Sequence, residues 1–135
     1  MAAHGRGPAA LRGVVMAIHW TALIVIVGWL FGAVPGVVVA VHAGLWGTIT
    51  AIWGLRGGPS PALRGAARTV AHLSHVALLG LYLAGAALAL PDHPLARPLL
   101  LATLAASTLH AVWNLYRAGV LGDGAFRRML PKALL

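Results

Sequence analysis

The sequence contains no cysteine and only two acidic residues among its 135. Without cysteine the chain can form no disulfide, no iron–sulfur cluster and no thiolate-ligated haem. The two acids, Asp92 and Asp123, lie beside proline or glycine, so no long apolar run carries a carboxylate. A zinc site, which needs about four nitrogen, sulfur or oxygen ligands, is therefore disfavoured. A proton relay through carboxylates inside a membrane is disfavoured for the same reason.

Charge is also scarce. Charged residues make up 9% of the chain and apolar residues 60%, whereas soluble domains have about 25% charged residues. The mean hydropathy is +0.87, and this composition predicts an integral membrane protein. The formal net charge is +8, but the basic residues flank apolar runs instead of lining a polar face, so nucleic-acid binding is not expected.

Four apolar runs are each long enough to cross a bilayer, which takes about 20 helical residues. They cover residues 13–33, 37–55, 69–90 and 98–117. We therefore predict an all-α membrane protein, an up-down bundle of four transmembrane helices forming one domain over residues 13–117. Residues 1–12 are expected to form a basic tail, and residues 118–135 a basic interfacial tail. Pro98 suits the first turn of the fourth helix.

Small residues recur at helical spacing in two of these runs. Those in the second are Ala40, Ala43, Gly47, Ala51 and Gly54, and those in the third are Ala77, Gly80, Ala84 and Ala87. Such ridges allow helices to approach closely in lipid. We expect both to lie at helix contacts.

Nearly all basic residues fall on one side of the predicted bundle. Arg97 lies alone on the other side. The remaining nine are Arg6, Arg12, Arg56, Arg64, Arg68, Arg117, Arg127, Arg128 and Lys132. The positive-inside rule then places the N- and C-termini in the cytoplasm.

Histidines occur in all four apolar runs, where an ionisable side chain is normally functional. His19 lies about six residues from the cytoplasmic end of the first span, and His110 lies about seven from that of the fourth, so the two imidazoles have nearly equal depth. Two such imidazoles can hold a haem iron from its two faces inside an apolar bundle. This ligation leaves no open iron position and favours electron transfer over oxygen activation.

A second haem would need another pair of ligands. His42 lies near the outer end of the second span, but the outer position on the helix stripe of His110 is Ala96, which cannot ligate iron. His93, in a proline-bounded turn, is the alternative partner of His42. In the competing interpretation, His42 bonds a neighbouring carbonyl and His93 is solvated.

Three further residues are candidates at the cytoplasmic end of the site. His72 and His75 share a helix face and are candidates to bond haem propionates or a quinone carbonyl. The alternative is that both lie at the interface and reach toward headgroups. Arg117, one heptad beyond His110, is a candidate partner of a propionate or a positive-inside anchor.

From about residue 12 to 131 the chain resembles the bacterial cytochrome b561 family of small four-helix dihaem proteins. The matching features are His19-Trp20, His42 with Gly44 and Gly47, AHLSHVALLGLY at 71–82, LHAVW at 109–113 and DGAFRRMLP at 123–131. The last motif is the most specific of these.

The resemblance implies b-type haem, a bacterial inner-membrane location and electron exchange with a lipid quinone. Some relatives oxidise superoxide and pass the electron to ubiquinone. The resemblance also implies that His19 and His110 ligate the cytoplasmic-side haem and that His42 ligates an outer haem. The chain departs from the family pattern at Ala96, where the outer ligand is usual, and at Arg117, where a histidine is usual.

Two functions are expected from these features. The first is a membrane b-type cytochrome, an oxidoreductase passing single electrons through bis-histidine haem to or from a quinone, with superoxide or a redox protein as the other partner. The second is a non-enzymatic anchor subunit that docks a soluble dehydrogenase on its basic cytoplasmic face. A homodimer in the membrane is compatible with both. A transporter or channel is disfavoured because no span carries an acid.

Overall fold

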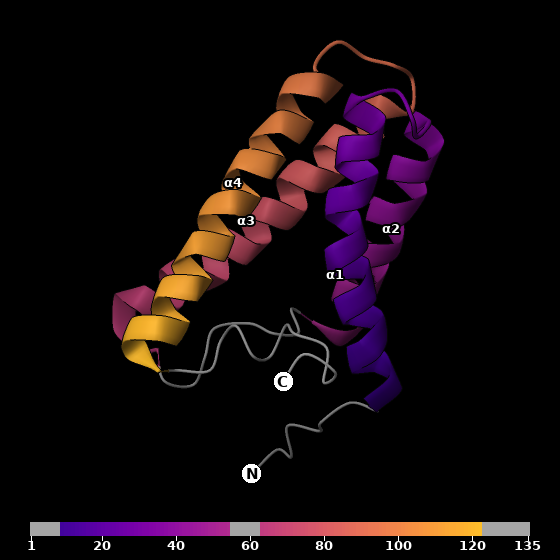
Figure 1. The fold of residues 1–135 in the computed structure, drawn as a ribbon. Coiled ribbons are helices and arrows are strands. Elements are labelled where there is room, and N and C mark those ends of the chain that lie inside the picture. Colours follow the sequence, from indigo (N-terminus) through magenta and orange to yellow (C-terminus); the bar gives the residue numbers. More distant parts are fainter. Residues whose placement is uncertain (1–8, 55–62, 123–135) are drawn as a thin grey trace.

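The computed structural model describes residues 9–54 and 63–122. Its helices are α1 (Ala9–Leu30), α2 (Gly36–Trp53), α3 (Gly65–Ala89) and α4 (Ala96–Tyr116), and α4 continues into a π-helical turn, η1 (Arg117–Leu121) (Figure 1). All four α-helices are long and apolar enough to cross a membrane. The predicted fold class, an all-α bundle of four transmembrane helices, is confirmed.

Several predicted features lie outside the described residues. They are Arg6, Arg56, Asp123, Arg127, Arg128, Lys132 and most of the two tails. The predicted interfacial tail is described only as far as Gly122, where η1 has just ended.

The helix boundaries differ from the predicted spans mainly where a helix enters a basic flank. α1 begins at Ala9 and α3 at Gly65, each a full turn before the span expected from hydropathy. Hydropathy marks the part of a helix that lies in hydrocarbon, whereas backbone hydrogen bonding continues into the interface. Pro98 lies in the first turn of α4 as predicted, where its missing N–H needs no partner within the helix.

Two tight turns join the helices at the outer end of the bundle, defined as the end that carries the α1–α2 and α3–α4 connections. In the first, Gly32 adopts a φ of 74°, and the N–H of Ala33 donates to the carbonyl of Gly28 at 2.8 Å. In the second, Asp92 adopts a φ of 53°, and the N–H of His93 donates to the carbonyl of Leu88 at 2.9 Å. Both turns hold consecutive helices close together at this end.

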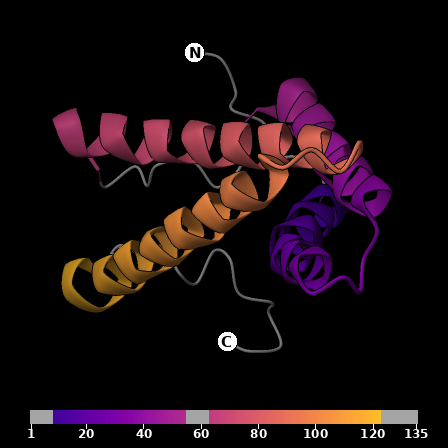
Figure 2. The same ribbon diagram turned by 90° about the horizontal axis from the view of Figure 1, so that it is seen from above.

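The helices pack as sequential neighbours and diverge away from the outer end. Contact is most extensive between α3 and α4, and α1 touches α4 only sparsely. Seen from above, α3 and α4 meet beside the turn that joins them and then separate (Figure 2). Space therefore opens between the helix pairs toward the inner end, where the basic residues Arg64, Arg68 and Arg117 lie.

The tightest packing is at the outer end. Val39, Ala89, Ala96 and Leu100 are fully buried there, and all four belong to one hydrophobic cluster. Glycines allow the close contacts in this cluster. A methyl group on Gly36 would overlap the carbonyl oxygen of Ala89, and one on Gly85 would lie 2.8 Å from a methyl of Leu100.

The prediction that the small residues of the third span lie at a helix contact is wrong. Ala77, Gly80, Ala84 and Ala87 are all exposed to the surroundings of the bundle. α3 instead packs through Gly85, Ala86 and Ala89. Small residues cover more than one face of α3, so spacing alone does not select the face, which is set by the fit to Leu100 and to the start of α2.

Candidate functional site

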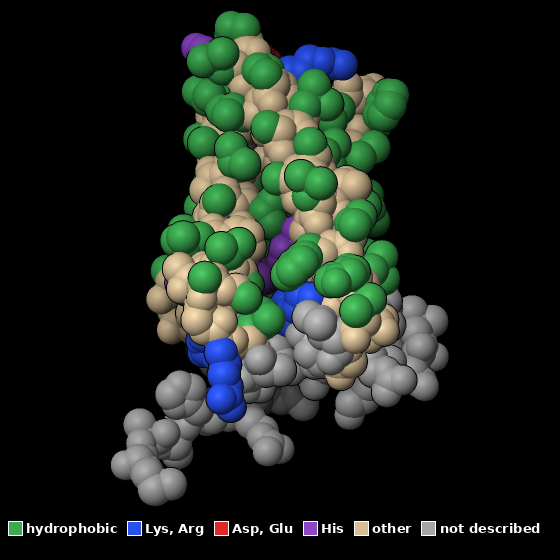
Figure 3. Space-filling model, turned by 90° about the vertical axis from the view of Figure 1, so that its left-hand side faces the viewer, with side chains coloured by type: hydrophobic (Ala, Val, Ile, Leu, Met, Phe, Trp, Pro, Cys, Tyr) green, Lys and Arg blue, Asp and Glu red, His purple; other side chains and the backbone are tan. Residues whose placement is uncertain are grey.

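A cleft of about 320 Å³ lies between the α1–α2 pair and the α3–α4 pair. Its volume is at the lower end of the range of small-molecule pockets, about 300–1,000 Å³. The walls are mainly apolar and include Leu23, Ile26, Leu79 and Leu104. From one side of the molecule, histidine side chains are visible in a groove between the helices, with arginine below them (Figure 3).

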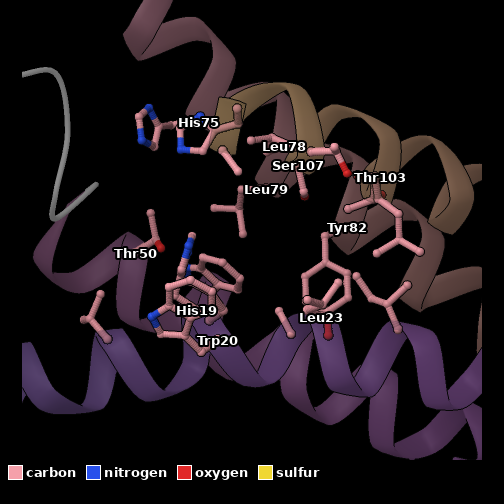
Figure 4. A pocket seen from close by; sticks show the side chains of 18 of the residues that line it. His19, Trp20, Leu23, Thr50, His75, Leu78, Leu79, Tyr82, Thr103 and Ser107 are labelled. Carbon is pink, nitrogen blue, oxygen red and sulfur yellow. Dashed lines mark hydrogen bonds between the residues drawn. The ribbon is translucent and has the colours of Figure 1, made fainter. Parts of the chain in front are cut away.

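Three histidines from three helices line this cleft: His19 of α1, His75 of α3 and His110 of α4. The rings of His75 and His110 meet edge to face, with centroids 4.6 Å apart. At 1.5 Å per residue, both lie about 21 Å from the outer ends of their helices, and His19 lies about 16 Å from the end of α1. The predicted pair His19 and His110 is thus brought to one cleft, with His75 added. Figure 4 shows His19 and His75 on opposite walls.

The three imidazoles differ in what their ring nitrogens contact. His75 donates from Nδ1 to the carbonyl oxygen of Ala71 at 2.6 Å, which leaves Nε2 as an acceptor facing the cleft. His110 accepts at Nε2 from the side-chain amide of Asn114 at 2.9 Å. Among the described residues, neither ring nitrogen of His19 makes a hydrogen bond.

His19 is held by ring contacts instead. Its centroid lies 5.7 Å from Trp20 and 5.6 Å from Trp46, both in edge-to-face geometry. A partly buried imidazole whose nitrogens lack hydrogen-bond partners carries a desolvation cost that a bound ligand can offset. The ring nitrogens of His19 are therefore available to a ligand in the cleft.

A buried cation lies at the inner end of the cleft. Arg117 is 3% exposed, and its guanidinium donates to the side-chain oxygen of Asn114 at 3.4 Å. Since Asn114 also bonds His110, the three residues form one polar row along the face of α4. η1 begins at Arg117, and π-helical turns occur frequently at functional sites.

His42 lies outside the cleft lining and bridges three helices. Its Nε2 is 2.9 Å from Oγ1 of Thr21 on α1, and its Nδ1 is 2.9 Å from the hydroxyl of Tyr82 on α3. The Thr21 hydroxyl donates to the carbonyl of Ala17 at 2.7 Å. Thr21 must therefore accept from Nε2–H, and the Tyr82 hydroxyl must donate to Nδ1.

The remaining predicted histidines are exposed. His72 lies on α3 away from the cleft, so it does not share the position of His75. His93 lies in the outer turn, where its Nδ1 accepts from the N–H of Leu95 at 3.2 Å. His42 and His93 are therefore not part of the cleft, and the iron-ligand roles assigned to them from sequence stay predictions.

Two residues of the site were missed by sequence reasoning. Asn114 bonds His110, and Trp46 packs between His19 and Tyr82. Each follows a histidine of its own span by four residues, His110 and His42 respectively, and so shares a helix face with it. An amide four residues after a histidine in an apolar run was the available signal for Asn114.

The fold and the cleft define a four-helix, multi-pass membrane protein with a histidine-lined internal site. In comparisons with known proteins, no family model, no curated protein and no solved structure matches the chain. The family resemblance carried by the sequence motifs therefore stays a prediction.

Proposed function

We propose that the protein is a membrane b-type cytochrome that holds haem in this cleft and exchanges single electrons with a lipid quinone. One observation carries the proposal: imidazoles from three helices converge on one apolar cleft inside a membrane bundle. Histidines in such a setting are expected to be functional. The sequence resemblance to a haem-binding family supports the same chemistry.

The residues of the cleft suit a bis-histidine haem. His19 on the α1 wall and His110 on the α4 wall are the ligands expected from sequence, and leucine side chains supply apolar faces for a porphyrin. Ligation through Nε2 of His110 would replace the hydrogen bond that this nitrogen accepts from Asn114. Haem, when bound, supplies a one-electron Fe(III)/Fe(II) couple. Arg117 and Asn114 at the inner end offer donors for an anionic propionate.

The buried Arg117 has an electrostatic role in this proposal. Its positive charge lies close to the cleft, three residues beyond Asn114 on α4. A nearby cation favours the less positive, reduced state of an iron centre and so raises its reduction potential. In a buried site the effect is weakly screened by solvent.

His75 is the residue we assign to the quinone. Because its Nδ1 proton is bonded to Ala71, Nε2 is left as an acceptor. An acceptor nitrogen matches the hydroxyl of a quinol, which must lose its proton when it loses electrons. We therefore place quinol oxidation or its reverse beside His75, in place of the sequence-based pairing of quinone with both His72 and His75.

The location follows from charge. Exposed Arg64 and Arg68 lie at the inner end of α3, and Arg97 at the outer end of α4 donates to the carbonyl of Leu30. With the basic end in the cytoplasm, both termini lie there and the outer turns face the other side of a bacterial inner membrane.

The test is a spectrum of the protein purified in detergent. Reduced-minus-oxidised difference spectra should show a low-spin b-type haem in the wild type, and haem should be lost or become high-spin in His19→Ala and in His110→Ala. His72→Ala is the matched control, because His72 is exposed outside the cleft. A haem-free wild type, or unchanged spectra in both cleft variants, would overturn the proposal.

The anchor function is the second candidate, favoured by exposed Arg64 and Arg68 at the inner end. An anchor docks its partner there without exchanging electrons with quinone itself. One reaction distinguishes the two functions, namely reduction of the haem in the isolated protein by a quinol. Rapid reduction supports the cytochrome, and no reduction supports the anchor.

A further inference from the structure

We propose that the outer half of the bundle is a closed core that holds no second haem, and that His42 braces three helices there. The part that concerns haem number rests on the proposed function. The brace rests on side-chain geometry alone, so the two parts can fail separately.

The space that an outer haem would need is filled by side chains. Val39 of α2, Ala89 of α3, and Ala96 and Leu100 of α4 are each 0% exposed. The helix backbones themselves are in contact at Gly36 and Ala89. A porphyrin placed here would have to separate helices whose backbones meet at Gly36 and Ala89, and rearranging the side chains of Val39 and Leu100 would not remove that contact.

The two candidate ligands also lie on opposite sides of this core. His42 is six residues beyond Gly36 along α2, which is about 9 Å deeper in the bundle. Gly36 packs against Ala89 at the end of α3, and His93 lies in the turn beyond that end. The fully buried layer of Val39 and Ala89 therefore lies between the depth of His42 and the depth of His93.

The ring nitrogens of His42 already have partners. Nε2–H donates to Thr21 and Nδ1 accepts from Tyr82, each at 2.9 Å. One imidazole thus joins α1, α2 and α3, and both of its nitrogens are satisfied. Iron ligation through Nδ1 would leave the Tyr82 hydroxyl without its acceptor in a membrane interior, where water is scarce, and ligation through Nε2 would break the bond that joins α2 to α1.

The brace also has a place in the site. Tyr82 is 2% exposed and lines the outer end of the cleft (Figure 4). Its ring packs on Trp46 at 6.1 Å, and Trp46 packs on His19. Among the described residues His42 therefore reaches the cleft only through Tyr82 and Trp46, and its own role is to hold α1, α2 and α3 together.

The sharpest test of haem number is Ala96→His, which restores a histidine at the outer position of α4. If only the ligand were missing, the haem-to-protein ratio would rise from one to two. We expect the ratio to stay at one and the detergent-solubilised protein to melt at a lower temperature. Ala105→His, at an exposed position of the same helix, should leave both quantities nearly unchanged. A ratio of two in Ala96→His would overturn the closed core.

His42 itself is tested by its spectrum and its coupling to Tyr82. His42→Ala should keep one haem per protein and a low-spin spectrum while lowering the melting temperature. If the wild type held two haems per protein and His42→Ala held one, the proposal would be refuted. In the double variant His42→Ala, Tyr82→Phe, the melting temperature should fall by clearly less than the sum of the decreases in the two single variants. Both substitutions remove the same hydrogen bond, so their effects should not add. Additive effects would show that the brace does not act as a unit.

Thr21→Val provides a milder check that does not depend on recovering the His42 variant. It removes one hydrogen bond of the brace at an exposed position of α1. We expect Thr21→Val to lower the melting temperature, as His42→Ala does, and to leave the haem-to-protein ratio unchanged. A wild type without haem would refute the proposed function, and the coupling measurement would still decide the brace.

Discussion

Gly36→Ala is expected to weaken the bundle at the contact between α2 and α3. The added methyl group would overlap the carbonyl oxygen of Ala89, a backbone atom that no rotamer change can move. Overpacking of this kind costs about 1–3 kcal/mol. The gain in helix propensity from glycine to alanine is at most about 1 kcal/mol and smaller at the first residue of a helix. The net loss in free energy of unfolding should be about 1–2 kcal/mol.

Gly44→Ala is the matched control in the same helix. A methyl group there meets nothing within 4 Å, so only the helix propensity changes, and the variant should gain up to about 1 kcal/mol. The two variants should therefore differ by roughly 2 kcal/mol, which is more than tenfold in the unfolding equilibrium. Both can be measured by denaturation in mixed detergent micelles, followed by far-UV circular dichroism. A Gly36→Ala protein as stable as Gly44→Ala would refute the close contact between Gly36 and Ala89.

Two further predictions concern charge and orientation. Arg117→Gln should lower the haem reduction potential by tens of millivolts, which is the scale of one charge at about 10 Å in an effective dielectric constant of about 20. A redox titration should show a smaller change in Arg64→Gln, because Arg64 is exposed. Equal changes in the two variants would contradict the role of burial. Because the chain has no cysteine, single cysteines report topology cleanly. In intact cells a membrane-impermeant maleimide should label Leu95→Cys and spare Arg64→Cys, and the reverse pattern would show that the bundle is inverted.

Hydropathy predicted the fold well because each span is long and has no carboxylate. The four runs correspond to α1 through α4, and the proline-containing connections fall between them. Composition could not say which face of α3 packs, since small residues occur all round it. Gly85 and Ala89 are at the interface because Leu100 and Gly36 meet them, and that match depends on the register between helices.

The site could be predicted only in part for a similar reason. Depth along each helix brought His19 and His110 to one level, and both line the cleft. His75 was expected near the membrane surface, but its ring packs on that of His110 and lines the cleft, because this face of α3 is turned toward α4. The partners of His42 are on α1 and α3, and which residues would face it depends on helix rotation, which a single sequence does not specify.

The most direct test of the central claim is to fill the cleft without touching a histidine. Ala111 and Ala105 of α4 are both exposed, but Ala111 lines the cleft and Ala105 does not. Ala111→Trp should lose most of its haem, measured as the haem-to-protein ratio of the purified protein, while Ala105→Trp keeps the wild-type ratio. If Ala111→Trp retains full haem with an unchanged spectrum, haem does not bind in this cleft and the account is contradicted.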